Sequence, residues 1–131
     1  MSKHFYPAVF TKERDGYSVY FPDLEGCFTE GDTLEEAYQM SRDAIGLFLL
    51  RENGRFEFPD ASSPKDIKLG ENEFVAIIEF DELEYLKRHE NKSVKKTLTI
   101  PSWLNALAEE KNINFSKTLQ NALKQELHID R

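Results

Sequence analysis

The fold of the N-terminal half is decided by residues 17–37, YSVYFPDLEGCFTEGDTLEEA. Tyr17 to Phe21 is rich in aromatic and β-branched residues, which is typical of a strand. Pro22 ends this strand, because proline has no amide hydrogen to donate to a neighbouring strand. A second, shorter strand is expected around Cys27 to Thr29, before the polar residues that introduce a helix.

The same stretch contains a helix start. Thr33 has the position of an N-cap, and Glu36, three residues later, completes the pattern of a capping box. From there small and apolar residues recur at helical spacing: Leu34, Ala37, Tyr38, Ser41, Ala44, Ile45 and Phe48. Asn53-Gly54 is expected to end the helix in a left-handed conformation.

Further strands are expected on both sides of this stretch. Phe5 to Thr11 reads as a strand that is joined to the next one by a turn at Asp15-Gly16. Phe74 to Phe80 is a nearly continuous apolar run of strand length, and Asp81 to His89 reads as a short closing helix. The order β-β-β-α-β predicts an α+β domain, with a helix packed on one face of a sheet.

Both faces of this sheet are expected to be apolar, since the first and last strands carry apolar residues in both alternating sets. A single helix covers one face, so something else should cover part of the other. One alternative is that the loop from Arg55 to Gly70, with Phe56 and Phe58, folds back over it. The other alternative is a protein partner.

Charge divides the 131-residue chain, whose formal net charge is −7. Residues 1–90 hold ten Lys and Arg against 20 Asp and Glu, whereas residues 91–131 hold seven against four, for net charges of −10 and +3. An acidic body is repelled by a phosphate backbone, and a small basic module is attracted to it. We therefore expect two domains, residues 1–90 and 91–131, joined at the polar stretch Glu90-Asn91-Lys92-Ser93.

The acidic segment resembles the HicB antitoxin family. The resemblance is carried by the aromatic strand, Pro22-Asp23-Leu24-Glu25-Gly26-Cys27 and Gly31-Asp32-Thr33-Leu34-Glu35-Glu36-Ala37, and it is dense over about the first 50 residues. It implies a partial RNase H-like fold without catalytic function, which binds and blocks a small mRNA-cleaving ribonuclease toxin of the HicA type. The motif residues also have plain structural roles in turns, caps and packing, so none is assigned a catalytic role.

The basic segment begins with an alternating strand, Ser93 to Ile100. Its apolar side chains are Val94, Leu98 and Ile100, and its opposite set is Lys95, Thr97 and Thr99, with Lys96 departing from the alternation. Pro101 ends the strand and opens a helix that carries Trp103, Leu104, Leu107 and Ala108. Asn114 and Ser116 are alternative caps of a final helix with Leu119, Ala122, Leu123 and Leu127.

A strand and two helices in about 38 residues cannot bury enough surface alone. Pairing with a second copy solves this, so we expect an obligate homodimer in which a two-stranded antiparallel ribbon lies over four helices. This plan resembles the ribbon-helix-helix DNA-binding family, whose second helix start is similar to residues 114–119. The expected dimer core is Leu98, Ile100, Trp103, Leu104, Leu107, Leu119 and Leu123.

A two-stranded ribbon fits the major groove of DNA. Lys95 would donate to guanine, and Thr97 and Thr99 would contact base edges through their hydroxyl and methyl groups. Backbone amides at the second helix start, over Asn114, Phe115, Ser116 and Lys117, would hold a phosphate. The alternative is an exposed Lys and Thr strand on an ordinary surface.

We therefore expect a bacterial antitoxin that neutralises a toxin and represses its own operon by binding operator DNA. A cytoplasmic location is expected, because Cys27 is the single cysteine and no apolar run approaches the roughly 20 residues that span a bilayer. No cofactor is expected. A protein-binding module whose tail only dimerises is one rival interpretation.

The other rival is a metal-dependent nuclease of RNase H-like fold, which needs an acidic residue inside the first strand. Phe5 to Thr11 and Tyr17 to Phe21 contain none. His4, His89 and His128 show no metal-ligand spacing, so no catalytic or metal-binding residue is expected. Cys27 is expected to be a small buried residue rather than a nucleophile.

Overall fold

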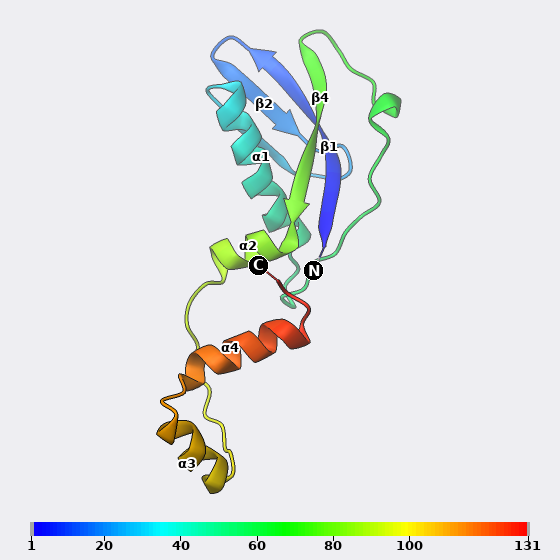
Figure 1. Ribbon diagram of the computed structural model, residues 1–131. Helices are drawn as coiled ribbons and strands as arrows, with labels where there is room; N and C mark the ends of the chain where they lie inside the picture. Colours follow the sequence, from blue (N-terminus) through cyan, green and yellow to red (C-terminus); the bar gives the residue numbers. More distant parts are fainter. Residues whose placement is uncertain (1, 131) are drawn as a thin grey trace. The chain divides into compact units, whose positions relative to one another are not determined.

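The computed structural model describes residues 2–130, and these divide between Lys92 and Ser93 into two compact units. The N-terminal unit contains β1 (Lys3–Glu13), β2 (Gly16–Tyr20), β3 (Phe28–Gly31), α1 (Leu34–Leu49), the 3-10 turn η1 (Pro64–Asp66), β4 (Glu73–Asp81) and α2 (Glu82–His89). The C-terminal unit contains α3 (Ser102–Glu110) and α4 (Phe115–Glu126). Figure 1 shows these elements along the chain. The expected strands and helices of residues 1–90 are all present, with shifted ends.

Four antiparallel strands form the sheet of the N-terminal unit, in the order β3-β2-β1-β4. β1 extends two residues beyond the expected end, so Glu13 lies within the strand and pairs with Gly16 across the hairpin. Gly16 has a φ of +152°, a conformation that favours glycine. The first strand thus contains an acidic residue, contrary to the expectation, although only at its hairpin end.

α1 packs on one side of this sheet, which we call the first face. The core there consists of strand residues that alternate along β1, β2 and β4 and of apolar residues from α1: Tyr6, Ala8, Phe10, Val19, Ile78, Phe80, Ala37, Ile45 and Leu49. The helix also buries Ser41, whose hydroxyl donates to the carbonyl oxygen of Ala37 at 2.7 Å. This face is filled by the chain itself and offers no open surface.

The start of α1 follows the sequence signal, but its end does not. The Thr33 side chain accepts a hydrogen bond from the amide of Glu36 at 3.1 Å, as expected for an N-cap. The helix stops at Leu49, because Leu50 is extended and forms a β-bridge with Phe56. Gly54, with φ of +79°, shapes the turn between these two residues instead of ending the helix.

The loop after α1 contributes two aromatic rings to the first face. Phe56 lies 5.3 Å from Phe80 and Phe58 lies 3.5 Å from His4, measured between ring centroids. Tyr6 donates a 2.6 Å hydrogen bond to the carbonyl oxygen of Pro59, and burial, followed by nearby carboxylates, raises the pKa of this tyrosine. In the alternative in which this loop covers the opposite face, the placement of Phe56 and Phe58 is therefore wrong, because both rings pack against the core of the first face.

Cys27 is buried directly before β3, which confirms that it is a small core residue. Burial raises the pKa of its thiol to about 11, so about one molecule in a thousand is ionised at pH 8. We expect alkylation of Cys27 by iodoacetamide at pH 8 to be at least about 100-fold slower in the folded chain than in urea. Mass spectrometry at timed intervals measures this, and equal rates would contradict the burial of the thiol.

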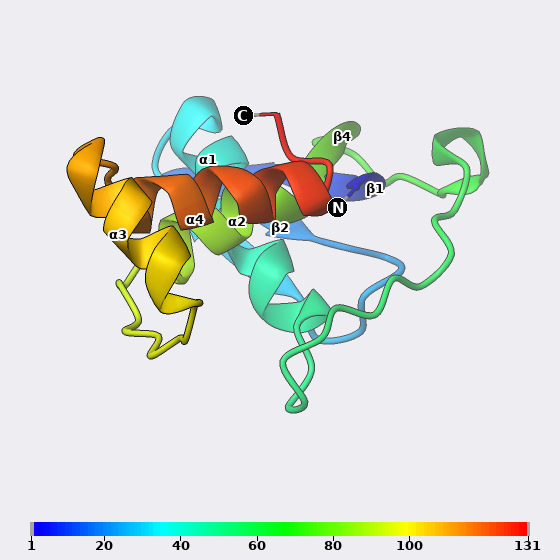
Figure 2. The same ribbon diagram turned by 60° about the horizontal axis from the view of Figure 1, so that its bottom comes forward.

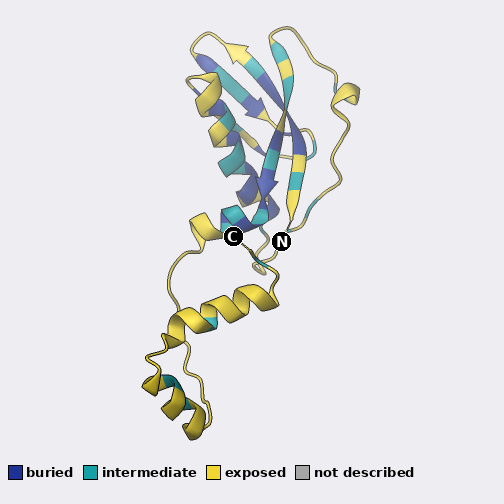
Figure 3. Cartoon of the chain, viewed as in Figure 1, coloured by how far each residue is buried: buried dark blue, intermediate teal, exposed yellow. Residues whose placement is uncertain are grey.

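The C-terminal unit contains two helices that leave most of their surface exposed (Figure 3). Residues 91–101 form no strand in the single chain, so the strand expected over 93–100 is not present in this state. A strand exists only through hydrogen bonds to a partner strand, and the described part of this unit supplies none. The alternating apolar and polar residues of positions 93–100 therefore have no neighbouring strand within residues 2–130 of one chain.

Candidate partner-binding surfaces

The side of the sheet opposite α1, which we call the second face, carries a row of apolar residues across all four strands. The strand register places Val75, Val9, Tyr20 and Phe28 side by side in this row. Pro7 and Ile77 form the next pair, and Phe5 follows on β1. Val9 and Pro7 are buried at the centre, whereas four large side chains around them stay exposed: Phe5 53%, Tyr20 40%, Phe28 71% and Ile77 43%.

A long exposed segment runs on this side without closing it. In both Figure 1 and Figure 2 the sheet lies between α1 and the green segment that carries η1. The amide of Ser62 in this segment donates to the Asp23 carboxylate at 2.9 Å, which fastens the segment to the loop before β3. The segment is exposed along almost its whole length. Pro7 and Val9 are buried on this side, whereas Phe5, Tyr20, Phe28 and Ile77 remain open to solvent.

Acidic side chains border the apolar row. Glu73, Glu30 and Glu13 occupy second-face positions beyond the row toward the β1–β2 hairpin, and Glu79 occupies one at the other end. Lys3 is a basic residue at these positions, and its Nζ lies 3.6 Å from Oε1 of Glu79. The second face therefore combines an apolar centre with a negative border.

An open groove continues this negative border at the hairpin end. Its volume is about 450 Å³, and five acidic residues and one basic residue are in its lining: Glu13, Arg14, Asp15, Gly16, Tyr17, Glu30, Gly31, Asp32, Glu36 and Met40. Glu13 and Glu30 belong to both the groove and the second face. Such a groove is suited to cationic side chains of a partner.

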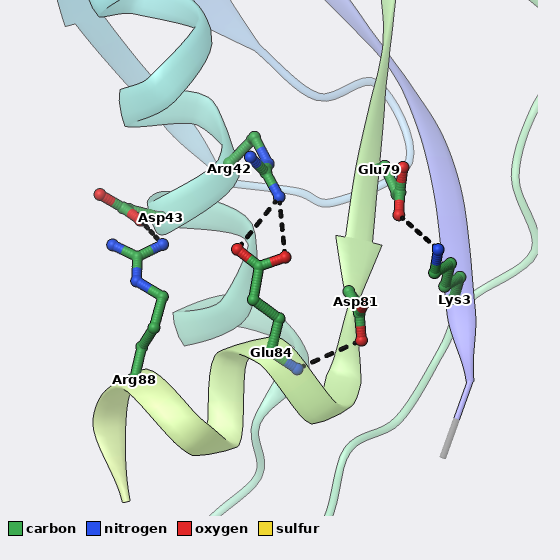
Figure 4. A network of polar contacts seen from close by, with 7 residues as sticks. All are labelled: Lys3, Arg42, Asp43, Glu79, Asp81, Glu84 and Arg88. Atoms are coloured by element: carbon green, nitrogen blue, oxygen red, sulfur yellow. Dashed lines mark hydrogen bonds and ion pairs between the residues drawn. The ribbon is translucent and has the colours of Figure 1, made fainter. Parts of the chain in front are cut away.

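A different group of charges holds α2 against α1 (Figure 4). Arg42 lies 3.2 Å from Glu84, and Arg88 lies 3.2 Å from Asp43. Asp81 is buried and caps α2, accepting from the amide of Glu84 at 3.2 Å. These carboxylates have partners within the unit. On the second face Glu73 and Glu79 also have partners, since Glu73 accepts from the amide of Gly70 at 2.6 Å and Glu79 pairs with Lys3, so Glu13 and Glu30 are the border carboxylates that line the groove.

Within residues 2–130, no three His, Cys, Asp or Glu side chains are grouped so that they could hold a metal ion. His4 stacks on Phe58, and His89 lies 4.3 Å from Tyr85 between ring centroids. These histidines therefore serve as packing partners of aromatic rings. No helix in the described part of the chain is long and apolar enough to cross a membrane.

The predicted DNA-contacting residues of the C-terminal unit are exposed. Lys95, Thr97 and Thr99 lie in the segment before α3. Of the two candidate caps, Asn114 is the one used, and its side chain accepts from the amide of Lys117 at 3.0 Å. The amides left at the start of α4 for a phosphate are then those of Phe115 and Ser116, since Lys117 is engaged by the cap.

The predicted dimer core is not buried in a single chain. Leu98, Ile100, Trp103, Leu104, Leu107 and Leu123 are exposed, with Trp103 at 64%, and Leu119 is half-buried. A monomeric unit with this many exposed large apolar side chains is unusual for a soluble domain.

Comparison with known proteins shows the family of the chain. A family model described as "HicB_like antitoxin of bacterial toxin-antitoxin system" matches residues 6–123. The chain belongs to this HicB-like antitoxin family. An uncharacterized 14.9 kDa protein of Haemophilus phage HP1 is 32% identical over 103 residues, 76% of this chain and 74% of that protein. Antitoxin HicB 2 of Photorhabdus laumondii is 46% identical over 46 residues, 34% of this chain and 33% of that protein.

Solved structures of antitoxin complexes resemble this HicB-like antitoxin over much of its length. A toxin–antitoxin complex from Streptococcus pneumoniae contains a chain with 29% identity and a TM-score of 0.58, and the match covers 95% of this chain and 99% of that one. A chain of a HicA3 and HicB3 complex has 28% identity and a TM-score of 0.50, covering 60% of this chain and 99% of that one. The α+β fold with its four-stranded antiparallel sheet is therefore one that HicB antitoxin structures share.

Sequence reasoning missed the open surfaces of this HicB-like antitoxin. Glu13 and Glu30 are 17 positions apart in the chain, yet both line the groove beside the hairpin. The turn at Asp15-Gly16 was the available signal, because it fixes which residues of β1 face β2. Extending that register to β3 would have placed Tyr20 beside Phe28 on the second face.

Proposed function

We propose that this chain binds and neutralises a HicA-type mRNA-cleaving ribonuclease toxin and represses its own operon by binding operator DNA. The observation that carries the proposal is the division into an acidic unit and a basic unit, at Lys92–Ser93. Membership of the HicB-like family and the likeness to chains of toxin–antitoxin complexes support it. In this proposal residues 1–90 bind the toxin and residues 91–131 bind DNA.

The toxin-binding role follows from charge and shape. A ribonuclease needs a basic surface to bind RNA, and an acidic protein unit competes for that surface. The N-terminal unit, as a partial RNase H-like fold that lacks catalytic function, would act by covering the toxin rather than by chemistry.

The DNA-binding role follows from the unused alternation of residues 93–100. In a homodimer two such segments would pair as an antiparallel ribbon, and the seven apolar residues of the predicted dimer core would be buried. Lys95, Thr97 and Thr99 would then face the major groove, while the start of α4 would lie beside a phosphate.

Co-expression with the toxin tests this proposal. We expect the small basic protein encoded beside this gene to arrest growth when expressed alone, and the full chain to restore growth. The fragment of residues 1–92 should restore growth too, because the toxin-binding surface lies within one compact unit. Growth arrest that persists with the full chain would reject the proposal. Arrest that persists only with a folded fragment would reject the division of roles.

A further inference from the structure

We propose that the toxin docks on the second face of the N-terminal sheet, with its basic side chains against the acidic border. The inference rests on the function proposed above and adds the place of contact. The apolar row Val75, Val9, Tyr20 and Phe28, with Phe5 and Ile77 beside it, forms the centre of the docking surface.

The apolar centre is the first reason. Four large side chains of one sheet face are 40–71% exposed, although the same chain supplies aromatic residues to the other face. Phe56 and Phe58 pack with Phe80 on the first face, so these two rings do not cover the exposed side chains of the second face. Contiguous exposed apolar side chains with a polar border are typical of protein interaction sites.

The charge of the border selects the kind of partner. Glu73, Glu30, Glu13 and Glu79 lie around the apolar row, and the acidic groove continues from Glu13 and Glu30. Lys3 is offset by Glu79. A second copy docked through the same face would bring like charges together, which costs binding energy, whereas a cationic protein surface would gain it.

The chain's own basic unit is a weaker candidate for this face. Its apolar side chains, among them Leu98 and Trp103, are the ones that the proposed homodimer buries. A partner with a separate basic surface therefore fits the second face better, and the proposed ribonuclease toxin has that chemistry.

A variant that introduces positive charge into the apolar centre tests the docking surface. Phe28→Lys combined with Ile77→Lys places two cations in the apolar centre, and both positions are exposed, so the fold should be kept. In titrations of full-length chain with the toxin encoded beside it, we expect binding to weaken by about 100-fold or more. Leu47→Lys is the matched control, because Leu47 is 70% exposed on α1, which packs on the first face. Its binding should stay within about threefold of the unmodified chain.

A second variant keeps the test independent of folding defects. Glu30→Lys changes only the exposed border, and we expect it to weaken binding by about tenfold at low salt, with a smaller effect at high salt. Circular dichroism confirms folding, and light scattering gives the mass of each free variant.

If the unmodified chain binds the toxin and both second-face variants bind equally well, the docking surface is wrong while the function stands. A smaller mass of the free double variant would assign this face to a second copy and overturn the inference. No toxin binding by the unmodified chain would overturn both proposals.

Discussion

Replacing Lys95, Thr97 and Thr99 together with alanine is expected to abolish specific binding to the DNA upstream of this gene. In the proposed ribbon these three side chains are the ones that reach base edges. Each good base contact contributes about 1–3 kcal/mol, so losing all three weakens operator binding by about a thousandfold or more. A gel-shift titration at one fixed salt concentration measures the change, with unrelated DNA as the reference.

Lys124→Ala is the control for this variant. It removes one positive charge from α4, as the triple variant removes one from the segment before α3. We expect it to weaken binding to operator DNA and binding to unrelated DNA about equally, and both only slightly. Operator affinity retained by the triple variant would contradict the base-contact assignment. Weak and salt-insensitive binding by the unmodified chain would favour a tail that only dimerises.

Gly31→Ala is expected to destabilise the N-terminal unit severely. A Cβ at residue 31 would overlap the backbone of α1, lying 2.7 Å from Cα of Ala37 and 2.9 Å from the carbonyl carbon of Glu36. Backbone atoms cannot rotate away, so β3 and α1 must separate. Overpacking of this kind costs about 2–3 kcal/mol, which corresponds to a fall in Tm of roughly 10–20 °C for a unit of this size.

Gly70→Ala is the matched substitution at a position where only a flexible side chain has to move. Its Cβ would meet only the end of the Glu73 side chain, at 3.3 Å. We expect a Tm within a few degrees of the unmodified chain, since the loss of glycine freedom in the unfolded chain offsets a small contact change. Thermal melts followed by far-ultraviolet circular dichroism compare the two variants. Similar Tm values for both would show that β3 and α1 are not in close contact.

Local signals predicted most of the N-terminal unit, because they act over a few residues. The Asp15-Gly16 turn and the Thr33 cap lie where the structure uses them. The end of α1 depends instead on a bridge between Leu50 and Phe56, on either side of a turn. Asn53-Gly54 marks that turn correctly, but nothing in the dipeptide shows that the helix has already stopped.

The surfaces were harder to predict, because they depend on contacts between distant residues. The sequence shows that both sheet faces are apolar, yet it does not say which face Phe56 and Phe58 cover. Their partners, Phe80 and His4, are more than 20 residues away in either direction. Likewise the pattern of residues 93–100 predicts a strand that only a second chain can complete. The proposed homodimer would supply that second chain, whereas the single chain shows no strand over residues 93–100.

If the exposed apolar side chains of the C-terminal unit are buried in the proposed homodimer, the stability of this unit depends on how much protein is present. A unit that is buried only against its own copy gains order by mass action, so dilution alone would loosen it. If the tail binds DNA as a dimer, as proposed, DNA occupancy in a cell would depend on protein abundance. When the copy number falls, the unpaired tails would become better substrates for proteases, and repression would decrease further until new synthesis restores the pool.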